Sequence, residues 1–369
     1  MKENADRWCF SKVQDNSIST LELTKVYGNF RAVDSLTIDI RSGDIVGFLG
    51  PNGAGKTTTI RMLCGLLSPS KGNATIAGLD VMKDNPEIRR IVGLLPESSG
   101  FYNWMNAKEY LLHFAALYKI ESHFAESRIA ALLKKVGLAN KSFAPISYYS
   151  RGMKQRLALA RTLINNPRII FLDEPTLGLD PKGQQDIQEI LLDLNKSKNV
   201  TIFLSSHAIS EVSSLCNTIA IVNRGKLIAN GTIEELRNLA GDSNDLVHIT
   251  VFNSQNTSYA LSKLPVDNII RYKGNDTDRR FKTVVVDPKR GDSSLNEIIK
   301  SFDKIGLQIY EIRRVNIGLE EIFFKLTEKS RSNANYNISQ QDNFRGRRQL
   351  SYLPDQHDAA TDQFGIEPQ

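Results

Sequence analysis

The chain has 369 residues, of which 41% are hydrophobic and 24% charged, so we expect a globular protein of about two to three domains. It contains no uninterrupted apolar run near the roughly 18 residues of a membrane span, no apolar signal core at its start, and three scattered cysteines without metal or disulfide spacing. Because the net charge of +6 is spread along the chain, it is only a weak sign of an anionic partner, and we expect no nucleic acid.

From about residue 17 to residue 240, short apolar runs alternate with amphipathic stretches, which predicts an α/β domain. Three of the runs are typical of buried parallel strands, at residues 44–50, 168–174 and 200–206. Between about 101 and 150 the pattern becomes helical, and Asn106 and Glu109 have the spacing of a capping box. We expect this segment to form a helical subdomain.

After a polar linker, residues 246–328 predict a small α+β accessory domain. The expected order is β-α-β-β-α-β, with strands at 246–252, 268–272, 281–287 and 307–313 and helices at 258–264 and 294–305. That order is typical of a ferredoxin-like fold. The domain should close with an amphipathic helix whose apolar face carries Leu319, Ile322, Phe323 and Leu326. Residues 330–369 are polar with little to bury, which predicts a disordered tail.

A glycine-rich loop follows the first predicted strand and matches the phosphate-binding pattern G-x-x-x-x-G-K-[ST]. Its glycines allow successive backbone N–H groups to face phosphate oxygens, and the following helix adds the positive end of its dipole. Lys56 supplies a charge to the β- and γ-phosphates, and the Thr57 hydroxyl is suited to bind Mg²⁺. A plain surface turn is the simpler alternative. The predicted nucleotide contacts are Gly50, Pro51, Asn52, Gly53, Ala54, Gly55, Lys56, Thr57 and Thr58.

Two acidic residues end the apolar run at 168–174. Asp173 has the position of an aspartate that binds Mg²⁺, usually through water. Glu174 follows at once, where it can orient or deprotonate the water that attacks the γ-phosphate. An acidic pair after a strand is more often a polar strand end, but here it continues as "PTLGLDP", which makes the pattern more specific.

The segment "YSRGMKQR", residues 149–156, resembles the signature loop of ABC transporter ATPases, whose common form is LSGGQ. Ser150 and Gly152 occupy the serine and the second glycine, while Tyr149 and Arg151 depart from the common form. The resemblance implies that this loop opens a helix and presents its N-terminus to ATP bound on a second subunit.

Other family motifs follow in order. Glu97 in "LLPESSG" lies at the Q-loop position, Asp180 lies in the D-loop, and His207 in "LSSHA" matches the switch histidine that senses the γ-phosphate. Tyr27 matches the aromatic residue that stacks on adenine. The resemblance implies nucleotide contacts for all four and a catalytic role for His207 beside Lys56 and Glu174. Because Glu97 replaces glutamine, it adds charge beside Mg²⁺ and is expected to tune coupling. Taken alone, Tyr27 would more often be a packing aromatic at a strand end, and His207 would more often be an ordinary core or surface histidine.

The resemblance covers about residues 17–240 and implies a P-loop NTPase fold of the ABC ATPase type. It also implies an ATP-hydrolysing subunit that uses ATP and Mg²⁺, pairs with a second ATPase subunit and powers a separate membrane permease from the cytoplasmic face of the membrane. The accessory domain resembles the one that follows many ABC-2 exporter ATPases, which favours export. Residues 101–105 (FYNWM) are either core or part of a groove where the permease docks.

Two alternatives compete with this interpretation. A soluble ABC-type ATPase acting on ribosomes or DNA is disfavoured, because the chain has one ATPase domain and no long coiled-coil insertion. A binding module without hydrolysis is disfavoured by Glu174 and His207. The cargo, the permease and the choice between homodimer and heterodimer are left open by the sequence.

Overall fold

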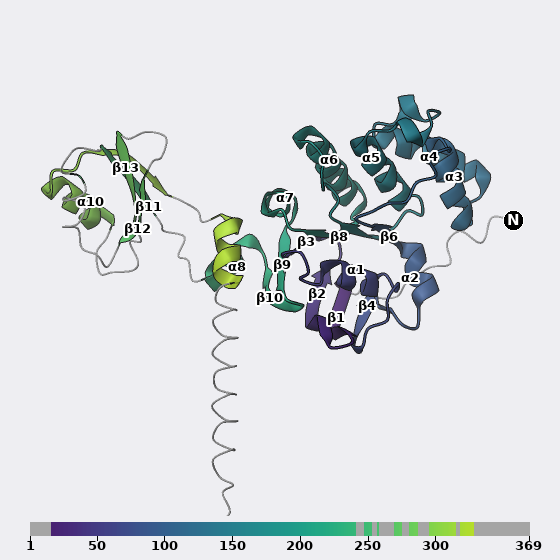
Figure 1. The fold of residues 1–369 in the computed structure, drawn as a ribbon, viewed down its shortest axis with the longest axis horizontal. Coiled ribbons are helices and arrows are strands. Elements are labelled where there is room, and N and C mark those ends of the chain that lie inside the picture. The colour runs from purple at the N-terminus through teal and green to yellow at the C-terminus, as the bar shows by residue number, and fades with distance from the viewer. Residues whose placement is uncertain are drawn as a thin grey trace, which may run out of the picture. The chain divides into compact units, whose positions relative to one another are not determined.

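The structure, a computed structural model, describes residues 16–240, 247–252, 257, 269–274, 280–286, 295–314 and 318–327. The predicted tail at 330–369 and the predicted helix at 258–264 lie outside the described residues. Figure 1 shows the described elements in chain order.

A six-stranded sheet with the order β10-β9-β3-β8-β7-β6 forms the centre of the first domain. Its strands are β3 (Ile45–Leu49), β6 (Val92–Leu95), β7 (Ile169–Asp173), β8 (Thr201–Ser206), β9 (Thr218–Asn223) and β10 (Lys226–Gly231). All neighbours pair in parallel except β10, which is antiparallel to β9. The three predicted strands are confirmed as β3, β7 and β8. Because these strands are parallel, the loops after their carboxyl ends meet at one edge of the sheet.

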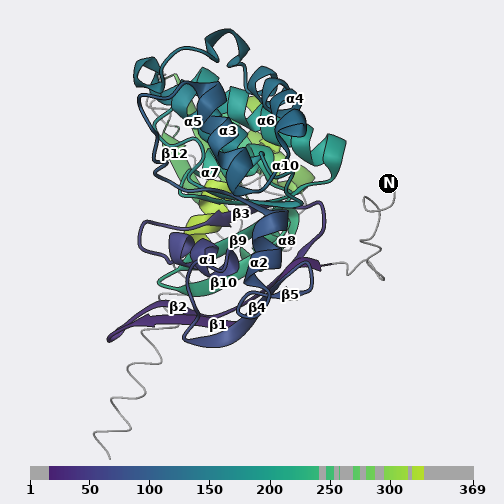
Figure 2. The same ribbon diagram turned by 90° about the vertical axis from the view of Figure 1, so that its right-hand side faces the viewer.

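One face of this sheet is covered by α1 (Lys56–Leu63) and by a second, antiparallel sheet (Figures 1 and 2). The second sheet has the order β2-β1-β4-β5 and consists of β1 (Asn16–Tyr27), β2 (Phe30–Arg41), β4 (Lys71–Ile76) and β5 (Leu79–Asp80). The short helix α2 (Asn85–Ile91) leads into β6. Phe48, Phe171 and Phe203 of the central sheet share one buried cluster with Ile60 of α1 and Ile18 of β1. This packing holds α1 directly behind the glycine-rich loop.

The other face is covered by α5 (Arg151–Thr162), α6 (Pro181–Lys198), α7 (Ile209–Leu215) and α8 (Ile233–Ala240). The side chains that alternate with the first set, such as Ile170 and Leu204, are buried there with Leu191 of α6 and Val212 of α7. Burial on both faces explains why the parallel strands are continuous apolar runs in the sequence.

The helical subdomain contains α3 (Ala107–Leu117), α4 (Ser122–Lys135) and two 3₁₀ turns at Ala139–Lys141 and Ile146–Tyr148. The predicted capping box is confirmed, since Glu109 N–H donates to Asn106 Oδ1 at 3.0 Å and Asn106 N–H donates to Glu109 Oε2 at 3.0 Å. Leu157 of α5 belongs to the core of this subdomain, whereas Leu159 of the same helix belongs to the core between the central sheet and the helices α5 to α8. Helix α5 therefore joins the two.

The described part of the accessory domain is an antiparallel sheet with the order β12-β13-β11-β14. It consists of β11 (Val247–Phe252), β12 (Ile269–Gly274), β13 (Phe281–Val286) and β14 (Ile309–Arg314). Helix α10 (Leu295–Lys304) packs Ile298 and Phe302 against Ile249 and Val284 of the sheet. The predicted strands are confirmed, and their order is that of a ferredoxin-like sheet, with the first and third strands in the middle.

The closing helix, residues 319–327, confirms the predicted amphipathic stripe. Leu319, Ile322 and Leu326 are buried in the same cluster as Leu236 and Ala240 of α8. The stripe is thus used for packing within the chain.

We expect Asn106→Ala to destabilise the first turn of α3 by about 1 kcal/mol, because the Glu109 N–H loses its side-chain acceptor Asn106 Oδ1. Hydrogen exchange of peptides that cover α3 should accelerate roughly fivefold. Glu121→Ala is the matched control, since Glu121 is the N-cap of α4 but its side chain makes no capping hydrogen bond. Equal exchange in both variants would contradict the role of the cap.

Candidate active site

The glycine-rich loop lies between β3 and α1 at the carboxyl edge of the central sheet. Gly55 is the N-cap of α1 with a φ of 101°, and a Cβ there would lie 2.4 Å from the carbonyl oxygen of Ala32. Only glycine fits this position without a shift. No side chain caps α1, so its first backbone N–H groups are left for an anion.

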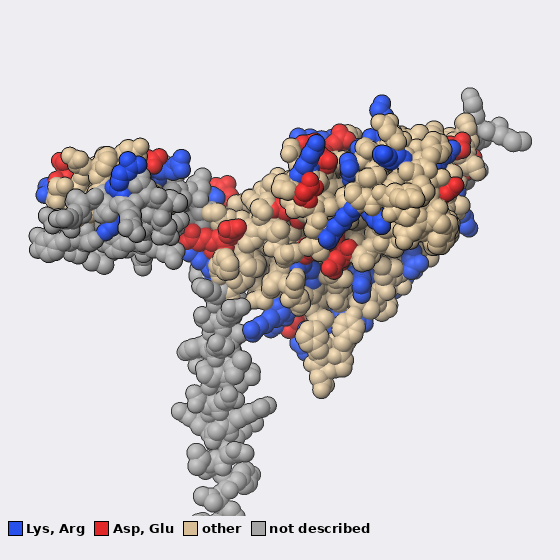
Figure 3. Space-filling model, turned by 45° about the horizontal axis from the view of Figure 1, so that its top comes forward, with Lys and Arg blue, Asp and Glu red and all other residues tan. Residues whose placement is uncertain are grey.

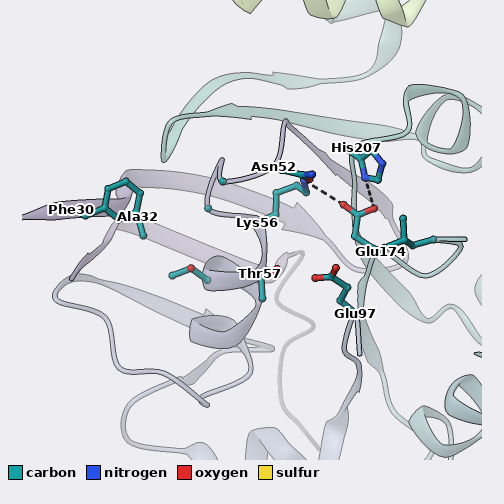
Figure 4. Close-up of a pocket in the computed structure, with 12 residues that line it drawn as sticks. Phe30, Ala32, Asn52, Lys56, Thr57, Glu97, Glu174 and His207 are labelled. Atoms are coloured by element: carbon teal, nitrogen blue, oxygen red, sulfur yellow. Dashed lines mark hydrogen bonds and ion pairs between the residues drawn. The ribbon is translucent and has the colours of Figure 1, made fainter. Parts of the chain in front are cut away.

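A cavity of about 460 Å³ opens beside this loop. Its lining comes from the loop itself, from the ends of β7 and β8, from the segment after β6, and from the β1–β2 hairpin (Figure 4). The lining residues are Phe30, Ala32, Asn52, Gly53, Gly55, Lys56, Thr57, Thr58, Glu97, Glu174, Leu177 and His207. The structure therefore brings together Lys56, Thr57, Glu97, Glu174 and His207, which lie far apart in the sequence.

Glu174 lies between two nitrogen groups. Its Oε1 is 3.4 Å from the Lys56 ammonium, and its Oε2 is 2.9 Å from Nδ1 of His207 (Figure 4). The ammonium also donates to the carbonyl oxygens of Gly50 at 2.8 Å and Pro51 at 3.3 Å. Glu174 and Lys56 are buried, whereas the His207 side chain is 46% exposed. The carboxylate is thus held at the cavity wall while the imidazole faces solvent.

The backbone of Glu174 adopts a φ of 52°, in the left-handed region that residues other than glycine rarely occupy. Strand β7 ends one residue earlier at Asp173. The turn directs the two acidic side chains differently, so that Glu174 lines the cavity and Asp173 does not. Such strain is common where a side chain must be aimed at a ligand.

Asp173 is buried and accepts a hydrogen bond of 2.5 Å from the Ser205 hydroxyl of β8. Among the described residues, no three His, Cys, Asp or Glu side chains form a metal cluster. The cavity does offer oxygen donors from Thr57, Glu97 and Glu174. Mg²⁺ usually binds one or two protein oxygens together with substrate phosphates, and this donor set fits that mode of binding.

Ser150, Gly152 and Asp180 are among the predicted site residues that do not line this cavity. Ser150 is the N-cap of α5 and accepts a hydrogen bond of 3.2 Å from Met153 N–H, with Gly152 in the first turn. Asp180 is the N-cap of α6 and accepts one of 3.2 Å from Gly183 N–H. Within this one chain, the signature loop is therefore separate from the glycine-rich loop's cavity.

Tyr27 does not line the cavity, whereas Phe30 does. The two residues face each other across the β1–β2 hairpin, and the Lys25 ammonium lies 5.3 Å from the centre of the Tyr27 ring. Sequence reasoning missed Phe30 and Ala32, which lie on β2 next to its hairpin with β1, and Leu177, which lies in the segment after β7.

Arg151, which departs from the common form of the signature loop, hydrogen-bonds to a backbone carbonyl of its own chain. Its Nη2 donates to the carbonyl oxygen of Leu177 at 2.8 Å, and Gln155 one turn later donates to that of Pro175 at 2.7 Å. Both carbonyls lie just after Glu174. Gly178 has a φ of 71°, and a Cβ there would overlap the guanidinium of Arg151. A second cavity, of about 490 Å³, is lined by Arg151, Gln155 and also Glu97.

The profile of the ABC transporter family matches residues 33–177. The chain is 43% identical over 220 residues to the bacitracin transport ATP-binding protein BcrA of Bacillus licheniformis, which covers 60% of this chain and 71% of that protein. It is 31% identical over 317 residues to the daunorubicin resistance ATP-binding protein DrrA3 of Streptomyces coeruleorubidus, covering 86% and 98% of the two chains.

Among solved structures, the fold is similar to a dimeric ATP-binding cassette in a post-hydrolysis state with bound ADP and Pi. The TM-score is 0.54 at 25% sequence identity, over 58% of this chain and 98% of that one. The match confirms the predicted P-loop fold of the first domain.

We expect Gly55→Ala to weaken binding of a fluorescent ATP analogue by about tenfold or more, because the new Cβ meets the Ala32 carbonyl and the backbone is left-handed. Gly53→Ala is the matched control, since Gly53 also has a positive φ but open space around its Cβ position. An equal loss in both variants would mean that backbone strain, and not the close approach at Gly55, controls the loop.

Proposed function

The chain belongs to the ABC transporter family of ATP-binding proteins, and from this premise we propose that it works as one of two paired ATPase subunits that power export through a separate membrane permease. Its activity is ATP binding and hydrolysis. The observation that carries the proposal is Glu174, held between Lys56 and His207 at the wall of the cavity beside the glycine-rich loop.

In this proposal the glycine-rich loop and Lys56 bind the phosphates of ATP. The first N–H groups of α1 face the anion, and the Lys56 ammonium is already held near the loop by the Gly50 carbonyl. Since Lys56 also pairs with Glu174, a bound phosphate would compete for the ammonium and leave the carboxylate free to accept a proton.

Glu174 then acts as the general base that orients the attacking water, and His207 senses the γ-phosphate beside it. Thr57, Glu97 and Asp173 are the groups that would hold Mg²⁺, which would supply positive charge to the phosphates. Asp173 would act on Mg²⁺ without lining the cavity itself, because its carboxylate is buried and accepts a hydrogen bond from Ser205. The work of these residues is to position water and phosphate and to stabilise charge.

Pairing of two ATPase subunits is supported by Ser150, Gly152 and Asp180, which do not line this chain's own cavity. Ser150 and Asp180 cap the N-termini of two helices, and Gly152 lies in the first turn of one of them, where backbone N–H groups suit a phosphate of ATP bound by a second subunit. The role of Tyr27 at adenine stays a prediction, and Phe30 in the cavity lining is a second aromatic candidate.

An aromatic patch formed by Tyr102, Trp104 and Tyr148 supports docking of a permease. Trp104 is 75% exposed and Tyr148 is 81% exposed. The two segments lie side by side, because Ile146 N–H donates to the Met105 carbonyl and Ser147 N–H donates to the Asn103 carbonyl. Exposed aromatic residues of this size are typical of protein interfaces.

The cargo that we propose is a drug-like molecule. Relatives of this chain are named for bacitracin transport and for daunorubicin resistance. The ribosome-associated alternative has no such support from these relatives. On the face that Figure 3 shows, basic and acidic side chains are interspersed, which is typical of an ordinary solvated surface.

Attachment to the cytoplasmic face of the membrane would come through the permease. Within the described parts of the chain, no helix has the length and apolar character to cross a bilayer.

Glu174→Gln should lower steady-state phosphate release by about 100-fold or more, because the amide keeps the shape but cannot accept the proton of the water. Binding of labelled ATP should remain, and gel filtration with ATP should show a dimer. Glu87→Gln, the same exchange at an exposed position of α2, is the control. Unchanged turnover in Glu174→Gln would remove the residue from the role proposed for it.

Purification of the tagged full-length chain from detergent-solubilised membranes is expected to recover a multi-span membrane protein with it. The double variant Trp104→Ala/Tyr148→Ala should reduce that recovery, because it removes most of the aromatic patch. Phe124→Ala, another exposed aromatic residue on α4, should not. Recovery of ribosomes or nucleic acid in place of a membrane protein would contradict the proposed partner.

A further inference from the structure

Glu211 on α7 is a buried carboxylate directly behind the active-site loops. We propose that it is a positioning residue, which fixes the segment that carries Glu174 relative to the loop that carries His207. This inference rests on the proposed function of that pair.

The carboxylate of Glu211 joins the two segments through one hydrogen bond each. Its Oε1 accepts from the Thr176 hydroxyl at 2.8 Å, and its Oε2 accepts from the Ser206 hydroxyl at 2.6 Å. Thr176 lies two residues after Glu174, and Ser206 directly precedes His207. Both hydroxyl-bearing residues are themselves buried. Each oxygen of the carboxylate is therefore committed to a different catalytic segment.

These contacts close a ring. The chain links Glu174 to Thr176, and the Glu211 carboxylate links Thr176 to Ser206. The chain then links Ser206 to His207, whose Nδ1 lies 2.9 Å from Glu174 Oε2 and completes the ring. The Ser206 hydroxyl also accepts from Ala208 N–H at 3.0 Å, which fixes the backbone on the far side of His207. Since the ring is closed, a shift of either segment must stretch one of its hydrogen bonds.

Burial of the Glu211 carboxylate costs free energy, because the charged group loses its contact with water. Loss of water raises the pKa of the Glu211 carboxyl, and the negative charge of Glu174 raises it further, while the Ser206 and Thr176 hydroxyls and His207 act in the opposite direction. An apolar side chain would fill the same space without this cost. What a carboxylate adds is two directional acceptors on one rigid group, which suits a residue that must hold two loops in register.

The position of a general base affects turnover more than it affects affinity for the substrate, since a misplacement of about 1 Å can cost on the order of 100-fold in rate. Lys56 and the glycine-rich loop, which bind the phosphates, meet this ring through the Lys56 contact with Glu174 and through the Gly50 N–H, which donates to the Ser206 carbonyl. Neither contact involves the Glu211 carboxylate. Loss of the Glu211 contacts should therefore act on kcat and leave ATP affinity nearly unchanged.

The test uses the full-length chain with three variants. Glu211→Gln keeps the shape but leaves one hydroxyl without its acceptor, and Thr176→Val removes the other end of one bond. Each is expected to lower kcat by about 10- to 100-fold, with the KM for ATP and the dissociation constant of a labelled analogue within about twofold of the original. The double variant should be no slower than the slower single variant, because both break the same ring.

Ser214→Ala is the matched control, because Ser214 lies on the same helix and donates to the backbone carbonyl of Glu211, not to its carboxylate. It should leave kcat unchanged. The proposal is overturned if Glu211→Gln and Thr176→Val keep full turnover, if their effects add, or if kcat, ATP affinity and melting temperature fall together, which would indicate a general structural role. Failure of the proposed function is distinguishable, since then Glu174→Gln would retain full turnover.

Discussion

Parallel pairing of β3, β8 and β7 is the constraint on which the active site depends. Because the three strands run in one direction, the loop after β3, Glu174 after β7 and His207 after β8 meet at a single edge. Burial of both faces of the sheet keeps these strands in register, since a shift would expose apolar side chains on one face or the other. The site thus inherits its rigidity from the core beneath it.

The segment that starts at Glu174 is held from several directions. Lys56 and His207 contact its carboxylate, Gln155 and Arg151 of α5 bind the carbonyls of Pro175 and Leu177, and Glu211 binds the Thr176 hydroxyl. The residues of this segment are therefore bound to the glycine-rich loop, to α5, which follows the signature loop, and to α7. Since α5 also belongs to the core of the helical subdomain, movement of that subdomain bears directly on the residues beside Glu174.

Local sequence spacing predicts much of the fold. The buried strands, the capping box at Asn106, the glycine-rich loop and the succession of strands along the accessory domain depend on residues close together in the chain or on regular periodicity. Such features follow from backbone sterics and local hydrogen bonds, which is why a single sequence carries them. The antiparallel sheet of β1, β2, β4 and β5 was not predicted strand by strand, and its central pairing joins Ile18 of β1 to Ile76 of β4, which are far apart in the chain.

By itself, the sequence determined which residues could bind phosphate and handle a proton, because Gly55, Lys56 and Glu174 lie in patterns whose chemistry is local. Only the tertiary structure decided which side chains surround them. It assigned Phe30 and not Tyr27 to the cavity lining, and it buried Glu211 behind the loops. The helix at 319–327 is a third case, since its amphipathic pattern does not say which surface it covers. The reason is the same each time: strand pairing and core packing join residues that are far apart in the chain, and no local pattern records the partner.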